Sequence, residues 1–155
     1  MRKILYTLLF IVFISNIATA QVGINTTTPL STLDINGNLN VKEIGIVNSN
    51  VAGSTVFYGG PSGSATPIDD GVYISLTPTS GSDEFILPNA ANVPGRIYML
   101  RNVSNSINAK IYSFGGQFFA KDSSTATTSP LSLSATTVTK TIIIVSDGQN
   151  WTYFF

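Results

Sequence analysis

Short strand-like runs, each followed by a turn, are the feature that most limits what this chain can fold into. Apolar residues do not recur three and four positions apart over any helix-length stretch, because glycine, proline and β-branched residues interrupt the pattern. Runs of strand length occur instead at Val72–Thr77, Glu84–Leu87, Arg96–Val103, Ala109–Phe114, Gln117–Ala120, Val138–Ser146 and Trp151–Phe155. We therefore predict an all-β protein whose main part is a compact antiparallel domain, either β-sandwich-like or of the fibre type.

Residues 1–20 have the layout of a secretory signal peptide. Arg2 and Lys3 precede the apolar run Ile4–Ile14. Ala18 and Ala20 follow it at the two positions that a signal peptidase reads. The run is short for a spanning helix, which needs about 20 apolar residues. We expect cleavage after Ala20 and a secreted or cell-surface protein.

A change of composition divides the rest of the chain into two parts. Residues 21–66 are poor in apolar side chains, and the segment GGPSGSATP, at residues 59–67, is typical of an extended connector. Most of the strand-like runs lie after it. We predict a polar N-terminal arm with a β-hairpin and a connector at residues 21–66, and a C-terminal antiparallel β-domain at residues 67–155.

Charge and missing residue types exclude several classes of function. Without the leader the chain keeps six basic and eight acidic residues, a formal charge of −2 that does not attract nucleic acid or anionic membranes. The sequence contains no cysteine and no histidine. Disulfides, lipid attached to cysteine, Cys-His nucleophiles and Ser-His-Asp triads are therefore excluded, and zinc sites are not expected. Packing and strand pairing, between chains where necessary, must hold the fold together.

The segment TKTIIIVSDGQNWTYFF predicts a C-terminal hairpin. Asp147-Gly148 between apolar β-formers is a strong turn signal, and as a two-residue turn it pairs Ser146 with Gln149. Ile144 then faces Trp151, and Ile142 faces Tyr153. The opposite face is apolar too, with Ile143, Val145 and Phe154. A strand that is apolar on both faces is expected in the middle of the protein.

The segment LDINGNLNV predicts a second hairpin near the N-terminus. A three-residue loop at Asn36–Asn38 pairs Ile35 with Leu39 and Leu33 with Val41, which brings all four apolar side chains to one face. A two-stranded hairpin is marginally stable in water. We expect the arm to pack on its own C-terminal domain or on copies of itself.

Three stretches resemble known surface proteins. VGINTTTPLSTLDINGNLNV, at Val22–Val41, resembles the VGIGTTxPxxxLDVxGNxxV segment of secreted Gram-negative surface proteins, phage tail fibres and tailspikes, with Asn25 where glycine is usual. FILPNAANVPGRIYMLRNVSN and VSDGQNWTYFF resemble parts of tail-fibre-like β-domains. The resemblance implies a structural or attachment module, often a trimer, on a Gram-negative bacterium. The segment often precedes an intramolecular chaperone; the chain stops at Phe155 without one, so assisted trimer folding of the tailspike type is not expected.

Acidic residues show no pattern of a catalytic or metal site. Asp34, Asn36, Asn38 and Asn40 alternate like calcium ligands, but Leu39 and Gly45 stand where an EF-hand needs glycine and glutamate, so we interpret the segment as a turn. Adjacent acids on a strand point to opposite faces, and the pairs Asp69-Asp70 and Asp83-Glu84 also lie next to glycine and serine, where we predict solvated turn residues. We expect no enzymatic activity, no cofactor and no metal.

Aromatic side chains are the candidates for contact with a ligand, because exposed rings stack on sugars. They are Tyr98, Tyr112, Phe114, Phe118, Phe119 and Trp151. Most alternate with apolar neighbours in strands, which favours a place in the core. Phe118 and Phe119 follow Gly115-Gly116 and are the candidates for glycan contact.

The sequence thus predicts an exported structural or adhesin-like protein that acts by multivalent attachment. Its expected partners are copies of itself, most simply in a trimer, and glycans or another surface protein, without nucleic acid or membrane insertion. A carbohydrate-binding β-sandwich is the alternative. A small outer-membrane β-barrel comes third: Trp151, Tyr153 and Phe155 alternate up to a C-terminal phenylalanine, as in its sorting signal, but most strands are too short to span a membrane.

Overall fold

The computed structural model describes residues 22–28, 33–35 and 56–155. The chain divides into two compact units, residues 1–42 and residues 43–155. Each unit is described by itself. The predicted signal peptide and part of the arm lie outside the described residues.

In the first unit, β1 (Val22–Ile24) pairs in parallel with β2 (Leu33–Ile35), so that Val22 faces Leu33 and Ile24 faces Ile35. Asn25 follows β1 with a φ of 58°, a left-handed conformation that asparagine tolerates better than most residues and that glycine adopts freely. The predicted partner of β2, the stretch 39–41, lies outside the described residues.

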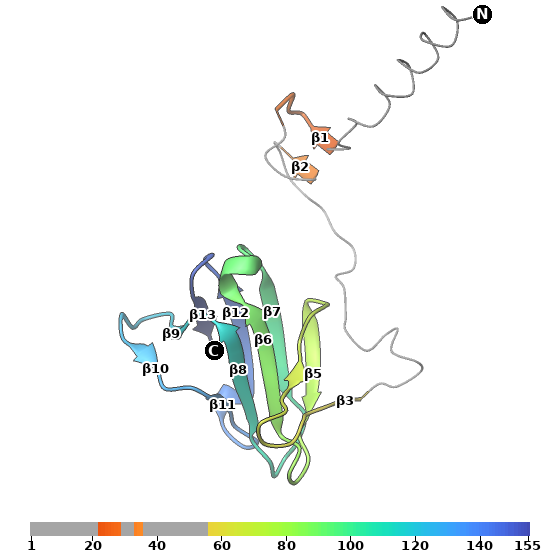
Figure 1. The fold of residues 1–155 in the computed structure, drawn as a ribbon, viewed down its shortest axis with the longest axis vertical. Helices are drawn as coiled ribbons and strands as arrows, with labels where there is room; N and C mark the ends of the chain where they lie inside the picture. Colours follow the sequence, from red (N-terminus) through yellow and green to blue (C-terminus); the bar gives the residue numbers. More distant parts are fainter. Residues whose placement is uncertain (1–21, 29–32, 36–55) are drawn as a thin grey trace, which may run out of the picture. The chain divides into compact units, whose positions relative to one another are not determined.

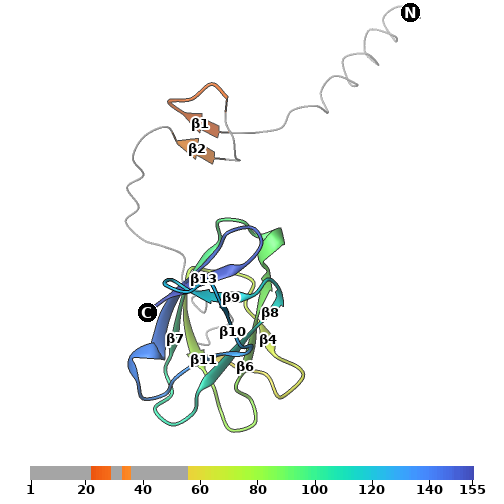
Figure 2. The same cartoon turned by 90° about the vertical axis from the view of Figure 1, so that its left-hand side faces the viewer.

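The second unit is a sandwich of two sheets, visible in both views of the ribbon (Figure 1, Figure 2). The wider sheet has the strand order β10-β9-β13-β12-β7-β5-β3, and the narrower one β11-β8-β6-β4. The strands are β3 (Phe57–Tyr58), β4 (Thr66–Pro67), β5 (Tyr73–Thr77), β6 (Glu84–Asn89), β7 (Ile97–Asn102), β8 (Ala109–Gly115), β9 (Phe118–Ala120), β10 (Ala126–Thr127), β11 (Leu131–Leu133), β12 (Thr141–Ser146) and β13 (Trp151–Phe154). Two short 3₁₀ turns lie at Ala90–Asn92 and Val138–Lys140.

The all-β prediction is confirmed, whereas the antiparallel pairing is only half right. β12 pairs antiparallel with both β7 and β13. The pairs β8–β11 and β9–β10 are also antiparallel. The pairs β3–β5, β5–β7, β4–β6, β6–β8 and β9–β13 are parallel. The parallel pairs arise because the chain crosses repeatedly from one sheet to the other, so that neighbours in a sheet are seldom joined by a hairpin.

The core lies between the two sheets and follows the alternation of side chains along the strands. Ile142, Ile144, Trp151 and Tyr153 point inward from β12 and β13 and are buried. The inward residues of the opposing sheet include Phe85, Leu87, Ala109, Ile111, Leu131 and Leu133. The ring of Tyr98 packs 6.0 Å from that of Trp151, and its hydroxyl donates to the carbonyl of Ile68 at 3.2 Å.

The C-terminal hairpin forms, but in a register that differs from the predicted one. Ser146 pairs with Trp151 and Ile144 with Tyr153, so residues 147–150 make the loop. The Asp147 carboxylate accepts the backbone N–H groups of Gln149 and Asn150 at 2.8 and 2.6 Å, and these bonds hold the longer loop. The register differs by two residues, which leaves every side chain on its predicted face.

The sandwich begins before residue 67, where the sequence places its start. β3 pairs with β5, and Gly60 forms a bridge with Glu84, so part of the predicted connector belongs to the domain. A Cβ at Gly60 would lie 1.9 Å from the carbonyl oxygen of Ser64, so only glycine fits there. The predicted strand Val138–Ser146 is shorter than expected, because its first three residues form a 3₁₀ turn.

Candidate functional site

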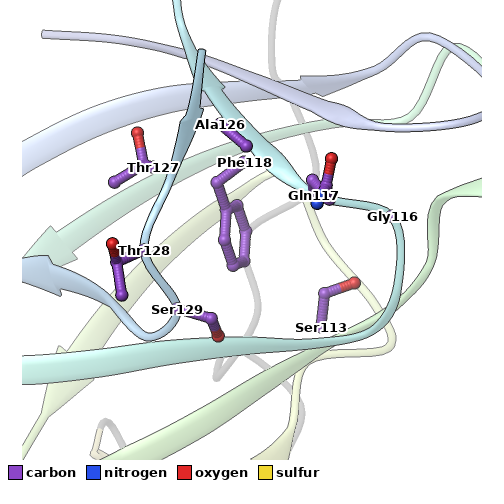
Figure 3. Close-up of a pocket in the computed structure, with 8 residues that line it drawn as sticks. All are labelled: Ser113, Gly116, Gln117, Phe118, Ala126, Thr127, Thr128 and Ser129. Atoms are coloured by element: carbon purple, nitrogen blue, oxygen red, sulfur yellow. The ribbon is translucent and has the colours of Figure 1, made fainter.

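A hollow of about 320 Å³ lies between the two sheets near β8, β9 and β10. Eight residues line it: Ser113, Gly116, Gln117, Phe118, Ala126, Thr127, Thr128 and Ser129. Figure 3 shows the ring of Phe118 in the middle, Gln117 and Ser113 on one side of it, and Thr128 and Ser129 on the other. None of these eight side chains carries a charge.

Two crossings of the chain between the sheets frame this hollow. The first runs from β8 in the narrow sheet to β9 in the wide sheet through Gly116, whose φ is 87°. A Cβ at Gly116 would lie 2.7 Å from the carbonyl oxygen of Gln149, so the turn needs glycine. The second crossing returns from β10 to β11 through residues 128–130, with a cis peptide bond before Pro130.

Two of the hydroxyl groups around the hollow are already bound to the protein. The Ser113 Oγ accepts the indole N–H of Trp151 at 3.0 Å and the backbone N–H of Gly115 at 3.1 Å, and it reaches the carbonyl of Pro88. The Thr127 hydroxyl is 2.9 Å from that of Tyr153. These bonds fix the inner wall of the hollow to the core.

Three other polar side chains at the hollow have no hydrogen-bond partner within the described sandwich. Gln117, Thr128 and Ser129 are exposed, and within residues 56–155 none of their side chains makes a hydrogen bond. The backbone of Gln117 is nevertheless fixed, since its N–H donates to the Asn150 side chain at 3.0 Å and its carbonyl accepts the N–H of Trp151 at 2.9 Å. The hollow therefore combines an anchored wall with a rim of unused donors and acceptors.

The two predicted glycan-contact residues, Phe118 and Phe119, lie on opposite faces of β9. Phe118 is 2% exposed and forms the base of the hollow, so only a small part of its ring can touch a ligand. Phe119 faces Thr152 of β13 in register and is half-buried on the outer face. Of the other aromatic candidates, Tyr98 and Trp151 are core residues, Tyr112 is half-buried and Phe114 is 68% exposed.

The paired acids occupy separate structural roles. Asp70 lies 3.8 Å from Arg96, and Asp83 lies 3.0 Å from Lys110. The hydrogen bond from Lys110 to Asp83 raises the pKa of the lysine above its usual value. Glu84 is 5% exposed beside a second hollow of about 280 Å³. Its carboxylate accepts the Gly63 N–H at 3.0 Å and the Tyr112 hydroxyl at 3.3 Å, so it ties down the loop before β4.

A cluster of apolar side chains lies on the outer face of the wide sheet and is partly open to solvent, with Thr141, Thr152 and Arg101 on the same face. In register across the strands, Tyr73 of β5 faces Met99 of β7, Met99 faces Ile143 of β12, and Ile143 faces Phe154 of β13. Ile143 and Phe154 are each 41% exposed and Ile97 is 43% exposed. A shallow hollow of about 290 Å³ runs between Ile143, Phe154 and Phe155. The prediction that β12 lies away from the edge is confirmed, since β7 and β13 flank it. The strand is not buried on both faces within the described part of the chain, because Ile143 on its outer face is 41% exposed.

The polar rim was not predicted from the sequence, because Thr128 and Ser129 lie in a run of serine and threonine that is typical of a loop. Within the described part of the chain, no three acidic side chains come together as metal ligands. No helix in that part is long and apolar enough to cross a membrane.

Comparison with protein-family models, with curated proteins and with solved structures finds no match for this chain.

Proposed function

We propose that the protein is an exported, non-enzymatic structural or adhesin-like module that works at the cell surface in several copies. The observation that carries this proposal is the cluster of apolar side chains on the outer face of the wide sheet, hereafter the apolar face: Tyr73, Ile97, Met99, Ile143, Val145 and Phe154. Exposed apolar patches of this kind on a soluble domain mark interaction sites.

A second copy of the chain suits the apolar face better than a charged partner does. Charged side chains stand at its borders, with Arg101 at the end of β7 and Lys121 directly after β9. The centre of an interface is depleted in charge, because burying an ion without a partner is costly. A copy of the same face brings apolar side chains and no buried charge, and closed symmetry is the usual form of such assemblies.

Two further features support work in several copies. In the first unit, Val22, Ile24 and Leu33 are each about half exposed, so that the short pair β1–β2 has apolar surface left to bury. The segment that contains it resembles part of trimeric tail fibres and surface proteins. A trimer is the assembly that we propose, and repeated copies would strengthen weak individual contacts.

Light scattering coupled to size-exclusion chromatography tests this proposal. The wild type is expected to elute with the mass of three chains. Ile143→Asp places a charge in the centre of the apolar face and is expected to give the mass of one chain.

Val138→Asp is the matched control, because Val138 is 85% exposed on a 3₁₀ turn outside the apolar face. It is expected to keep the mass of the wild type. A wild type with the mass of one chain, or an Ile143→Asp variant that stays assembled, would contradict the proposal.

A further inference from the structure

We propose that the hollow beside Phe118 binds one residue of a neutral saccharide through the side chains of Gln117, Thr128 and Ser129. The inference names a partner for the proposed attachment module and in that sense rests on it. It concerns a different surface, however, so that each proposal can fail without the other.

The absence of charge in the lining selects the class of ligand. A phosphate, sulfate or carboxylate group would need a cation or a cluster of N–H donors, and a basic ligand would need an acid. The eight lining residues provide hydroxyl groups, one amide and one aromatic ring. Hydroxyl groups and amides can donate and accept at once, which matches the paired hydroxyl groups of a sugar.

The state of each polar group decides which residues make the contacts. Ser113 and Thr127 are held by Trp151 and Tyr153, so they shape the wall. The side chains of Gln117, Thr128 and Ser129 are exposed and make no hydrogen bond within residues 56–155. Contacts from these side chains to sugar hydroxyl groups therefore break no hydrogen bond within this part of the chain.

The size and support of the hollow fit a single sugar residue. Its volume of about 320 Å³ is at the lower end of the range of small-ligand sites, roughly 300–1,000 Å³. The rim belongs to short segments whose neighbours are fixed: the backbone of Gln117 is bonded on both sides, and β10 and β11 hold residues 128 and 129 between two sheets. A rim fixed in this way loses little conformational entropy on binding.

Two other hollows in the described sandwich lack this combination. Beside Glu84, the charged group is already occupied by the Gly63 N–H and the Tyr112 hydroxyl. The hollow beside Phe154 is lined by Thr141, Ile142, Ile143, Phe154 and Phe155, which offer a single side-chain hydroxyl. Of the three, only the hollow beside Phe118 presents several free polar groups around a pocket.

Affinity electrophoresis tests the assignment. The purified protein runs through native gels that contain mannan, dextran or galactan, with the anionic polymer alginate as the charged comparison. At least one neutral polymer is expected to retard the wild type more than alginate does. Gln117→Ala is expected to weaken this binding about tenfold, the effect of one lost hydrogen bond in a small site, and Gln117→Ala with Ser129→Ala is expected to abolish it.

Matched controls separate the site from general surface effects. Gln149→Ala and Ser132→Ala remove an exposed amide and an exposed hydroxyl outside the hollow and are expected to bind as the wild type does. Retardation by none of the neutral polymers, or equal retardation of Gln117→Ala and the wild type, would overturn the assignment.

Amide NMR with a short oligosaccharide of the retarding polymer separates this inference from the proposed assembly. The amides of Gln117, Thr128 and Ser129 are expected to shift in the wild type and also in Ile143→Asp, since one chain contains the whole site. If the apolar face does not join copies of the chain, these amide shifts are still expected, because the saccharide site does not depend on assembly. If shifts appear only at residues outside the hollow, the saccharide assignment is wrong even for an assembled protein.

Discussion

The hollow beside Phe118 and the apolar face lie on opposite sides of the wide sheet and differ in shape and in chemistry. On β9, Phe118 points inward to the hollow, and Phe119 points to the outer side, where it pairs in register with Thr152 of β13. The hollow is concave and rimmed by uncharged polar groups, while the face is formed by aliphatic and aromatic side chains. The first suits a small ligand rich in hydroxyl groups, and the second suits an extended partner of the same apolar kind.

In the account proposed above, this difference would keep ligand binding and assembly on separate surfaces of the sandwich. Because side chains alternate along a strand, adjacent residues serve different surfaces, and a change at one position leaves its neighbour in place. The account therefore predicts that adjacent substitutions give unlike results.

The largest expected effect is that of Trp151→Ala, which damages the structure beneath both surfaces. Trp151 is fully buried, packs against Tyr98 and donates to Ser113 at the wall of the hollow. The substitution is expected to lower the free energy of unfolding by about 3–5 kcal/mol. Urea unfolding measures this loss of stability. The control is Thr136→Ala, a substitution at an exposed residue that is expected to change the free energy of unfolding by about 0.5 kcal/mol or less. A loss below about 1 kcal/mol would mean that Trp151 does not anchor the sandwich.

The next comparison sets Ile144→Ala against Ile143→Ala, two neighbours on β12 that face opposite ways. Ile144 is fully buried, so its truncation is expected to cost about 2–5 kcal/mol at any protein concentration. Ile143 is expected to act through assembly, so the effect of its truncation grows as protein concentration rises. Urea unfolding at a low and a high concentration measures both. An Ile143 effect that is independent of concentration would break the distinction between the faces.

A smaller effect is expected for Glu84→Ala, which tests whether the hollow beside Glu84 is structural. Its removal leaves the Gly63 N–H and the Tyr112 hydroxyl without their acceptor, an expected cost of about 1–3 kcal/mol. Thermal and urea unfolding measure this cost, and Asp122→Ala, a substitution at an exposed acidic residue, is the control. Binding to the neutral polymers is expected to stay as in the wild type; a large loss would place the saccharide near Glu84 instead.

The smallest effect concerns the pH dependence of the β12–β13 loop. The backbone N–H groups of Asn150 and Gln149 lower the pKa of Asp147 below its ordinary value of 3.8. A lowered folded-state pKa gives stability that is present above the unfolded pKa and is lost as pH falls through the folded pKa. Stability of the wild type is therefore expected to decline from about pH 4 downward. Unfolding midpoints measured below about pH 4 are expected to fall less steeply with pH for Asp147→Asn than for the wild type. Equal slopes for the two proteins would mean that the Asp147 carboxylate does not contribute to the pH dependence.

Strand positions could be predicted from the sequence where a run was long enough to show a pattern. β5, β6, β7, β8, β9 and β13 lie within a residue or two of their predicted bounds. β3, β4, β10 and β11 have only two or three residues, too few for alternation to show. Parallel pairing joins segments far apart in the chain, and no local pattern records it.

The candidate site was less accessible to prediction than the fold. Phe118 was identified as a residue near a ligand, but the side chains that surround it come from the β8–β9 turn and from residues 126–129. They meet only because the chain crosses twice between the sheets. The exposed side of Ile143 was missed for a related reason: an apolar strand looks the same in sequence whether its second face is covered by its own chain or left for another.

Sedimentation equilibrium of the wild-type protein over a wide range of concentrations tests the central claim most directly, because it needs no ligand and no substitution. The account predicts a mass three times that of the chain. This mass is either reached as the concentration rises or is present at every concentration. The mass of a single chain at every concentration would contradict it, because the apolar face would then stay open to water in the working protein.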